Sequence, residues 1–337
     1  MRRINVLFLV IVLFFCACGS QPGEPKFVNL RGVVFGTYYS ISYYSEDGKN
    51  YQSEIDSLFA DINRSLSYYD PNSLISRINR NETDSADEYF LPVLTRSLQI
   101  AQKTNGAFDP TISPLVNAWG FGFAEKQNMT QQRVDSLRKI VGYKKVRING
   151  NQVIKEIPEI QFDFNAIAKG YASDLAGLLL ESKGISVYMV ELGGDLVARG
   201  KKPDGSPWRI GLEKPAKNKY AEQDWDYMVE MHNLAVATSG NYRKYYIEGG
   251  MRYSHTIDPE TGYPVNHNLL SASVFASDCK TADAYATAFM VMGLDKSIEF
   301  LQDKPELQAF FIYSLNKEEY ETYTSEGLSV IPRSELQ

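Results

Sequence analysis

Apolar residues recur along this chain with two different spacings, which separate predicted helices from predicted strands. Between residues 53 and 67 they return every three or four positions, the pattern of an amphipathic helix. The same spacing predicts further helices over about 90–104, 129–141, 168–183 and 280–292. Gly184 and Gly293 follow the last two segments, and glycine commonly ends a helix.

Runs rich in β-branched and aromatic residues predict the strands. The first covers 33–44 and is interrupted at Gly36-Thr37. The others cover 144–148, 152–156, 187–192, 196–199, 208–213, 226–237, 242–247, 251–257 and 269–276. This mixture predicts an α+β fold with antiparallel-rich sheets and packed helices. No repeat or linker marks an internal boundary, so residues 30–337 are predicted to form a single domain.

The N-terminus has the pattern of a targeting segment. Arg2 and Arg3 precede a run of about a dozen apolar residues, which is shorter than the ~20 needed to span a bilayer. The run ends in Cys16-Ala17-Cys18-Gly19-Ser20, which resembles a bacterial lipoprotein signal. We therefore expect a signal peptide over 1–17, a lipid on Cys18 and a flexible tether over 18–29.

These features predict a protein of the bacterial cell envelope, anchored to a membrane and facing the periplasm or the exterior. The alternative is ordinary secretion with an unmodified cysteine.

Composition narrows the function classes. The 337 residues carry a formal net charge of −6 and no basic block, which argues against nucleic acid as a partner. Only three histidines and three cysteines are present, so a zinc cage or a disulfide framework is not expected.

Asp283 and Thr287 lie four residues apart on a predicted helix that is otherwise mostly apolar. Such a helix should be buried, and a buried carboxylate is costly unless it is paired or bound to a metal ion. A carboxylate with a hydroxyl suits Mg²⁺. The alternative is that Asp283 caps the helix and Thr287 bonds to its own backbone.

The segment from Asp163 to Tyr171 runs from a strand end into a helix start. Lys169 falls in the first helical turn, where it would strengthen an anion site, and the carbonyl of Ala166 would be free to ligate a cation. The alternative is that Asp163 or Asn165 simply caps the helix. Gly193-Gly194-Asp195 is typical of a tight turn, although glycines also allow a ligand to approach the backbone.

Two further stretches carry candidate chemistry. The loop from Gly106 to Thr111 contains Asp109, and the segment from Ser254 to Pro264 contains His255. His255 is expected in a strand, on the same face as Ile257. A lone histidine is usually structural, so this residue gains meaning only together with the other stretches.

Taken in order, these stretches resemble the ApbE-type FAD:protein FMN transferases, formerly called thiamine-biosynthesis lipoproteins. The resemblance runs from about Val33 to Gly293. It is carried by GTYYSI, LSYYDPNSLISRIN, GAFDPT, DFNAIAKGYASD, ELGGDLVARG, ATSGNYRKY, SHTIDPETGYPV and ADAYATAFMVMG.

The resemblance implies a single unit with T-fold-like subdomains around a central FAD cleft. It also implies Mg²⁺-dependent transfer of FMN from FAD to a Thr or Ser hydroxyl of an acceptor flavoprotein, with release of AMP. The implied metal ligands are the Ala166 carbonyl, Asp283 and Thr287, and His255 would help to activate the acceptor hydroxyl. The implied FAD contacts are Phe35, Tyr69, Ala107, Phe108, Asp109, Asp163, Lys169 and Ile257.

Departures from the family pattern are few. Phe35 stands where methionine is common, and Ala286 stands where some members have a further aspartate. Two alternatives remain at this point: hydrolysis of FAD to FMN and AMP in the same site, and a lipoprotein that binds FAD without turnover. A purely structural envelope lipoprotein would leave the motifs unexplained.

Overall fold

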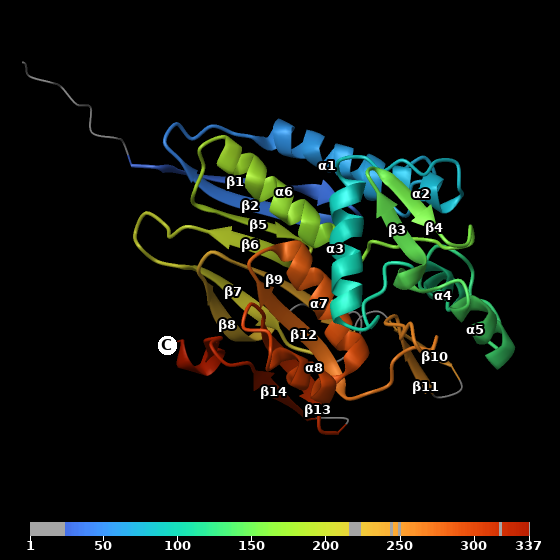
Figure 1. Cartoon of the computed structure of the whole chain (residues 1–337). Helices are drawn as coiled ribbons and strands as arrows, with labels where there is room; N and C mark the ends of the chain where they lie inside the picture. Colours follow the sequence, from blue (N-terminus) through green and yellow to red (C-terminus); the bar gives the residue numbers. More distant parts are fainter. Residues whose placement is uncertain (1–23, 216–223, 243–244, 249–250, 317–318, 337) are drawn as a thin grey trace, which may run out of the picture.

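An eight-stranded sheet forms the centre of the computed structural model, which describes residues 24–215, 224–242, 245–248, 251–316 and 319–336 (Figure 1). Its strand order is β1-β2-β5-β6-β9-β12-β13-β14, and each neighbouring pair is antiparallel. In that order, the strands are Lys26–Val34, Thr37–Ser45, Tyr188–Leu192, Asp195–Arg199, Leu234–Gly240, Leu269–Ala276, Gln308–Ser314 and Tyr320–Thr324. The predicted α+β class is confirmed.

The sheet consists of two halves with the same element order. In each half, two strands precede a long helix and two strands follow it: β1, β2, α6 (Ala168–Ser182), β5 and β6, then β9, β12, α7 (Cys279–Met292), β13 and β14. The halves join where β6 pairs with β9, which we call the β6–β9 seam. Helices α6 and α7 pack against each other over one face of the sheet (Figure 1).

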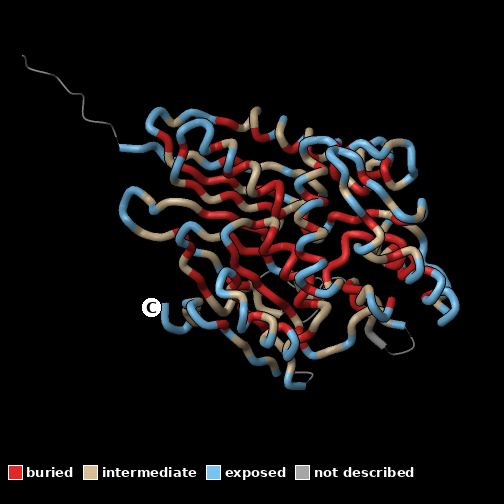
Figure 2. Tube along the Cα trace, viewed as in Figure 1, coloured by how far each residue is buried: buried red, intermediate tan, exposed pale blue. Residues whose placement is uncertain are grey.

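Alternating side chains give the molecule three layers. On β6, Val197 packs into the core beneath the helices, whereas Leu196 and Ala198 face the opposite side. There they meet a small sheet of order β15-β8-β7, formed by Val330–Pro332, Trp225–Met231 and Trp208–Glu213. The large sheet is therefore covered on both faces, and its central strands are buried (Figure 2).

A long insertion between β2 and β5 lies partly next to α6 and partly at one side of the large sheet (Figure 1). It contains α1 (Gln52–Leu66), α2 (Leu74–Asn79), α3 (Phe90–Lys103), α4 (Ser113–Ala118), α5 (Gln131–Arg138), β3 (Val146–Asn149) and β4 (Gln152–Lys155). A hairpin of β10 (Tyr245–Glu248) and β11 (Met251–Ser254) packs against it. The contact is aromatic, because Trp119 stacks on Tyr253 with 5.8 Å between ring centroids.

Most predicted helices are confirmed, and the errors concern strand limits, one helix length and elements that the sequence pattern does not reveal. The strand predicted over 33–44 is the β1–β2 hairpin, which begins at Lys26, so residues 26–29 of the predicted tether form strand instead. The strand predicted over 226–237 is two strands, because Asn233 turns the chain with φ of 51°. The helix predicted over 129–141 is shorter, and α2, α4, α8 (Leu294–Leu301), β13, β14 and β15 were not predicted.

The predicted signal peptide and Cys18 lie outside the described residues. Within the part of the chain that is described, no helix is long and apolar enough to cross a membrane.

Gly170 sets how closely α6 approaches α7. A Cβ atom at this position would lie 2.4 Å from the carbonyl oxygen of Cys279 and 2.8 Å from the amide nitrogen of Lys280. Both neighbours are backbone atoms at the start of α7, so neither can rotate away. We predict that Gly170→Ala lowers the free energy of unfolding by about 1–3 kcal/mol, the usual cost of overpacking, as measured by chemical denaturation.

Gly177→Ala is the matched control, because the same helix would there meet only side-chain atoms of Tyr188. Both substitutions replace a glycine of the same helix by alanine, so their difference reports mainly on the contact between helices. Equal stability of the two variants would contradict the proposed role of Gly170.

Candidate functional site

A cleft of about 1550 Å³ opens where the insertion meets the β6–β9 seam. Residues from both sides of the seam line it, among them Leu196 and Val236. The site residues predicted from the sequence line the same cleft: Phe35, Tyr69, Ala107, Phe108, Asp109, Asp163, Ala166, Lys169, His255, Ile257, Asp283 and Thr287. Segments far apart in the sequence therefore converge on one place.

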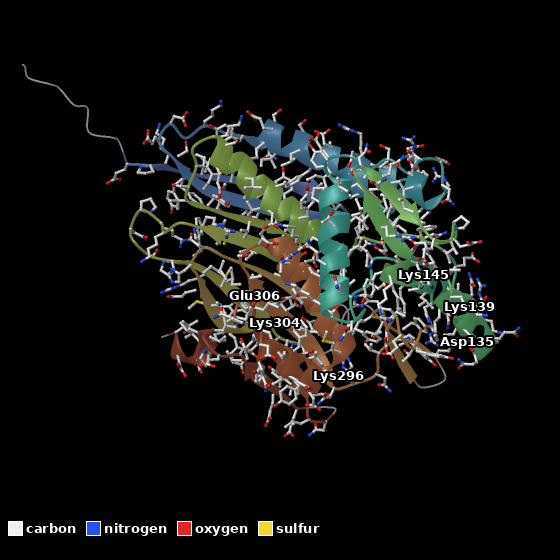
Figure 3. The ribbon with its side chains drawn as sticks, viewed as in Figure 1. Asp135, Lys139, Lys145, Lys296, Lys304 and Glu306 are labelled. Carbon is white, nitrogen blue, oxygen red and sulfur yellow. The ribbon has the colours of Figure 1, made fainter. Side chains whose placement is uncertain are left out.

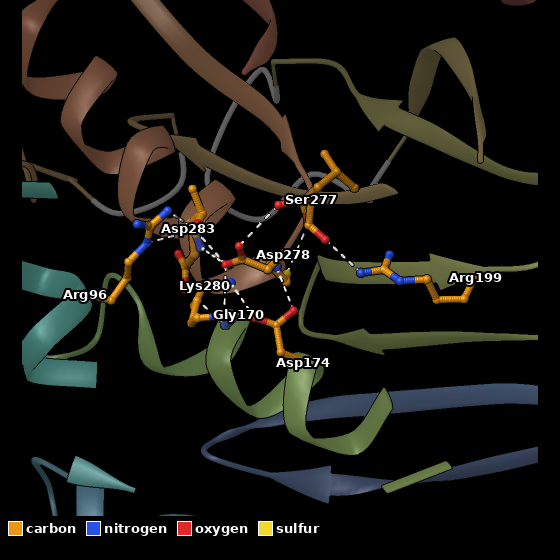
Figure 4. Close-up of polar contacts among 11 residues, drawn as sticks. Arg96, Gly170, Asp174, Arg199, Ser277, Asp278, Lys280 and Asp283 are labelled. Atoms are coloured by element: carbon orange, nitrogen blue, oxygen red, sulfur yellow. Dashed lines mark hydrogen bonds and ion pairs between the residues drawn. The ribbon is translucent and has the colours of Figure 1, made fainter. Parts of the chain in front are cut away.

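Asp283 lies on the buried face of α7, and only 4% of its surface is exposed. Its Oδ2 accepts a hydrogen bond of 3.2 Å from the backbone N–H of Gly170 (Figure 4). The N-cap of α7 is Asp278, which accepts from the N–H of Thr281, so the capping alternative for Asp283 is wrong. The alternative in which the Thr287 hydroxyl bonds to the backbone of its own helix is not observed either. The hydroxyl pairs instead with that of Ser239 at 3.1 Å.

The start of α6 provides the opposite wall. The N-cap position is Ile167, which has no capping side chain, so neither Asp163 nor Asn165 caps this helix. Asp163 instead accepts a 2.8 Å hydrogen bond from the N–H of Asn165 and shapes the approach to the helix.

The carbonyl of Ala166 is left without a hydrogen-bond donor among the described residues. The N–H of Gly170, four residues further on, would be the ordinary helical donor to that carbonyl, but it donates to Asp283 instead. The Asp283 carboxylate of α7 and the open Ala166 carbonyl before α6 are thus linked through one residue, Gly170.

Asp195 was missed as a site residue by the sequence reasoning, which treated it as part of a tight turn. The turn is present, with φ of 52° at Gly193 and 93° at Gly194. It begins β6 with Asp195 buried, and the ammonium of Lys169 donates a hydrogen bond to the carboxylate Oδ2 of Asp195. What marks Asp195 as a site residue is its buried contact with Lys169. The spacing of residues along the chain does not reveal that contact.

The charges of Asp195, Asp283 and Lys169 shift the pKa values of their neighbours in this cluster. Burial, and after it the negative charge of Asp195, raise the pKa of Asp283 to about 7. Burial opposes the charged form of Lys169, but Asp195 and Asp283 together raise the pKa of this ammonium above its usual value. Two carboxyl groups therefore share one ammonium in a poorly solvated place.

The loop after α3 is ordered by Asp109. Its carboxylate accepts hydrogen bonds from the N–H of Thr111 at 2.8 Å, from the hydroxyl of Thr111 at 2.6 Å and from the N–H of Tyr143 at 2.9 Å. Burial raises the pKa of Asp109, whereas these bonds and the charge of Lys145 (labelled in Figure 3) lower it. Asp109 therefore holds the loop, which presents Ala107 to the cleft.

His255 follows β11, which ends at Ser254, so the strand predicted over 251–257 is too long. Its ring nevertheless lines the cleft and meets Phe121 edge to face, with 6.5 Å between ring centroids. Ile257 forms an isolated bridge with Pro264 and also faces the cleft.

Two aromatic residues lie at the cleft surface. Tyr69 is 65% exposed and packs edge to face on Tyr68. Phe35 has a positive φ of 53°, unusual for a residue with a Cβ, and packs edge to face on Phe59. Both present ring surface on which a planar ligand can stack.

The described residues contain no group of three or more His, Cys, Asp or Glu side chains that could hold a metal ion. The cleft offers a mixed set instead: the Asp283 carboxylate, the Thr287 hydroxyl and the open Ala166 carbonyl. All are hard oxygen donors, and Mg²⁺ typically takes few protein ligands together with water and phosphate oxygens. The residues present therefore fit Mg²⁺ and do not fit a zinc cage.

Comparison with known proteins identifies the family of this chain. The model of the ApbE family matches residues 35–311. A relative from Vibrio cholerae is 38% identical over 87% of this chain and 89% of its own, and one from Escherichia coli K12 is 33% identical over 93% and 92%. Both are named FAD:protein FMN transferase.

Solved structures agree as well. The flavin transferase ApbE from Vibrio cholerae superposes with a TM-score of 0.79 at 35% identity, covering 90% of this chain and 98% of its own. The ApbE protein from Thermotoga maritima does so with a TM-score of 0.77 at 30% identity, covering 89% and 97%. Because the family model matches most of the chain, and relatives share the fold and the sequence over nearly their whole length, this chain belongs to the ApbE family.

Proposed function

We propose that this chain is an FAD:protein FMN transferase, which moves FMN from FAD to a Ser or Thr hydroxyl of an acceptor flavoprotein and releases AMP. The observation that carries the proposal is the convergence of the predicted site residues on one cleft. Relatives that match this chain over nearly its whole length have that name. A cleft of about 1550 Å³ is also larger than the roughly 300–1,000 Å³ of ordinary ligand pockets, which suits a dinucleotide together with an acceptor segment.

Asp283, Thr287 and the Ala166 carbonyl would hold a Mg²⁺ ion. When bound, such an ion would neutralise charge on the diphosphate of FAD and on the phosphorus under attack. Lys169 supports the same task, because its ammonium lies in the first turn of α6, where the helix N-terminus also favours an anion. Tyr69 and Phe35 offer ring surface for the flavin or the adenine.

In the proposed reaction, the acceptor hydroxyl oxygen forms a bond to the FMN-side phosphorus. The bond from that phosphorus to the bridging oxygen breaks, and AMP leaves with the bond's electron pair. His255 would take the hydroxyl proton on a ring nitrogen, the common role of histidine near neutral pH. With water in place of the hydroxyl, the same steps would give FMN and AMP.

One assay separates the candidate functions. Incubation with FAD and Mg²⁺, with and without an acceptor flavoprotein, is followed by chromatography of AMP and by flavin fluorescence on a denaturing gel. A fluorescent acceptor band together with AMP supports transfer, and AMP with free FMN alone supports hydrolysis. A binding protein without turnover would release no AMP with any metal ion.

The proposal includes attachment to the bacterial envelope through a lipid on Cys18, with the protein facing the periplasm or the exterior. Its support is the sequence pattern of residues 2–20. Fractionation of cells that express the wild type or Cys18→Ser tests it, since the variant should leave the membrane fraction.

Asp283→Asn is predicted to lower AMP release by about 100-fold or more, the scale for losing one preorganised charge contact. The amide keeps an oxygen that can accept from Gly170 but lacks the charge that would hold the cation. Because burial disfavours the ionised form, the variant should unfold at or above the wild-type temperature. Unchanged AMP release would remove Asp283 from the reaction.

His255→Ala is predicted to lower the transfer rate by about 10²–10⁴-fold, the usual contribution of a general base, while FAD affinity measured by flavin fluorescence changes little. His232→Ala is the matched control, because His232 is exposed, beside Glu230, and does not line the cleft. If His255→Ala abolished FAD binding instead, His255 would be a binding residue and not the base.

A further inference from the structure

Asp195 is a buried carboxylate whose partner is a residue of the proposed site. Only 2% of its surface is exposed, and its Oδ2 accepts from the ammonium of Lys169. Its backbone carbonyl also accepts a 3.2 Å hydrogen bond from the hydroxyl of Ser173, one turn further along α6. Asp195 is the first residue of β6 after the Gly193-Gly194 turn. These two hydrogen bonds join it to α6, the helix that carries Lys169.

Two carboxyl groups compete for this one ammonium. The negative charges of Asp195 and Asp283 both stabilise protonated Lys169, and the direct hydrogen bond goes to Asp195. Asp283 is bonded to the neutral N–H of Gly170 and is close enough to hydrogen-bond to Asp195. Asp283 is the other carboxylate whose charge acts on Lys169, so it would be the remaining partner of the ammonium if Asp195 lacked its charge.

A change of partner of Lys169 from Asp195 to Asp283 would alter the charge that a bound cation meets. With Asp195 present, the pair of Lys169 and Asp195 is neutral, and a divalent ion meets a carboxylate at Asp283 whose charge no ammonium cancels. Without Asp195, the ammonium would cancel the charge of Asp283 and repel the ion at short range. The net charge that faces the ion would become less favourable by one unit.

We propose that Asp195 is a positioning residue that holds the Lys169 ammonium away from Asp283, so that Lys169 faces the diphosphate and Asp283 stays available to the divalent cation. This inference rests on the cation site of the proposed function. It assigns to Asp195 a role through Lys169 and requires no contact between Asp195 and FAD. A merely structural role, in contrast, would affect stability without affecting the affinity for a cation.

The test measures Mn²⁺ binding to the FAD-saturated protein, from the electron paramagnetic resonance signal of free Mn²⁺, with unfolding temperatures recorded in parallel. Asp195→Asn should weaken Mn²⁺ binding by about tenfold or more, because the ammonium then pairs with Asp283. The double variant Asp195→Asn with Lys169→Met should restore the affinity to within about threefold of the wild type, because it lacks both charges. Lys169→Met alone should bind Mn²⁺ at least as tightly as the wild type.

Asp174→Asn is the matched control. Asp174 is another aspartate facing α7, with 9% of its side chain exposed, and it accepts from the N–H groups of Cys279 at 2.7 Å and Lys280 at 3.0 Å, outside the cleft (Figure 4). This variant should unfold at a lower temperature and leave the Mn²⁺ affinity unchanged.

Three results would overturn the proposal: unchanged Mn²⁺ affinity in Asp195→Asn, no rescue in the double variant, or weaker binding in Lys169→Met. The Mn²⁺ affinity of Lys169→Met tests the proposal even if Asp195→Asn fails to fold. Absence of Mn²⁺ binding in the wild type would overturn the cation site and this inference with it, whereas the assay of AMP release and acceptor labelling decides FMN transfer separately.

Discussion

The structure depends on how two buried carboxylates are accommodated beside the β6–β9 seam. Asp195 and Asp283 are both nearly inaccessible, and the ammonium of Lys169 donates a hydrogen bond to Asp195 and interacts with the charges of both carboxylates. Removing a carboxylate from water costs several kcal/mol unless an opposite charge or hydrogen bonds compensate. A site with this negative excess favours a cation, and a cation in turn favours the diphosphate of a dinucleotide.

The rest of the fold brings these groups together. The two half-sheets join at the seam, and each contributes one helix whose chain carries part of the cluster: α6 carries Lys169 and α7 carries Asp283. Gly170 allows the helices to touch, and its N–H bonds to Asp283 in place of the Ala166 carbonyl. The missing Cβ of Gly170 permits the close approach of the helices, and its backbone N–H, by turning to Asp283, leaves the Ala166 carbonyl open, so packing and site geometry meet at one residue.

Much of this arrangement could be predicted from the sequence. The boundaries of α6 and α7 follow from apolar spacing and terminal glycines, and the site residues follow from the family motifs. The pairing of distant elements could not be predicted in this way. The insertion of α1 to α5, the two-fold order of the sheet and the covering layer of β7 and β8 depend on contacts between segments that share no local pattern.

Local errors have physical causes as well. Asn233 adopts a left-handed conformation that divides one apolar run into β8 and β9. Asparagine tolerates this conformation, but an asparagine in the sequence does not by itself predict it. Residue type leaves Asp163 or Asn165 open as an alternative helix cap, but the chain reaches α6 through a turn at which Ile167 takes the N-cap position. Asp195 has an ordinary turn sequence, and only its burial against Lys169 distinguishes it from a surface aspartate.

Crystals grown with FAD and Mn²⁺ test the central claim most directly, because anomalous diffraction locates the ion without assumptions about catalysis. The account predicts a peak within coordination distance of Asp283, the Thr287 hydroxyl and the Ala166 carbonyl, with diphosphate oxygens completing its shell. A fully bound FAD whose diphosphate lies away from Asp283, or an ion bound elsewhere in the cleft, would contradict it.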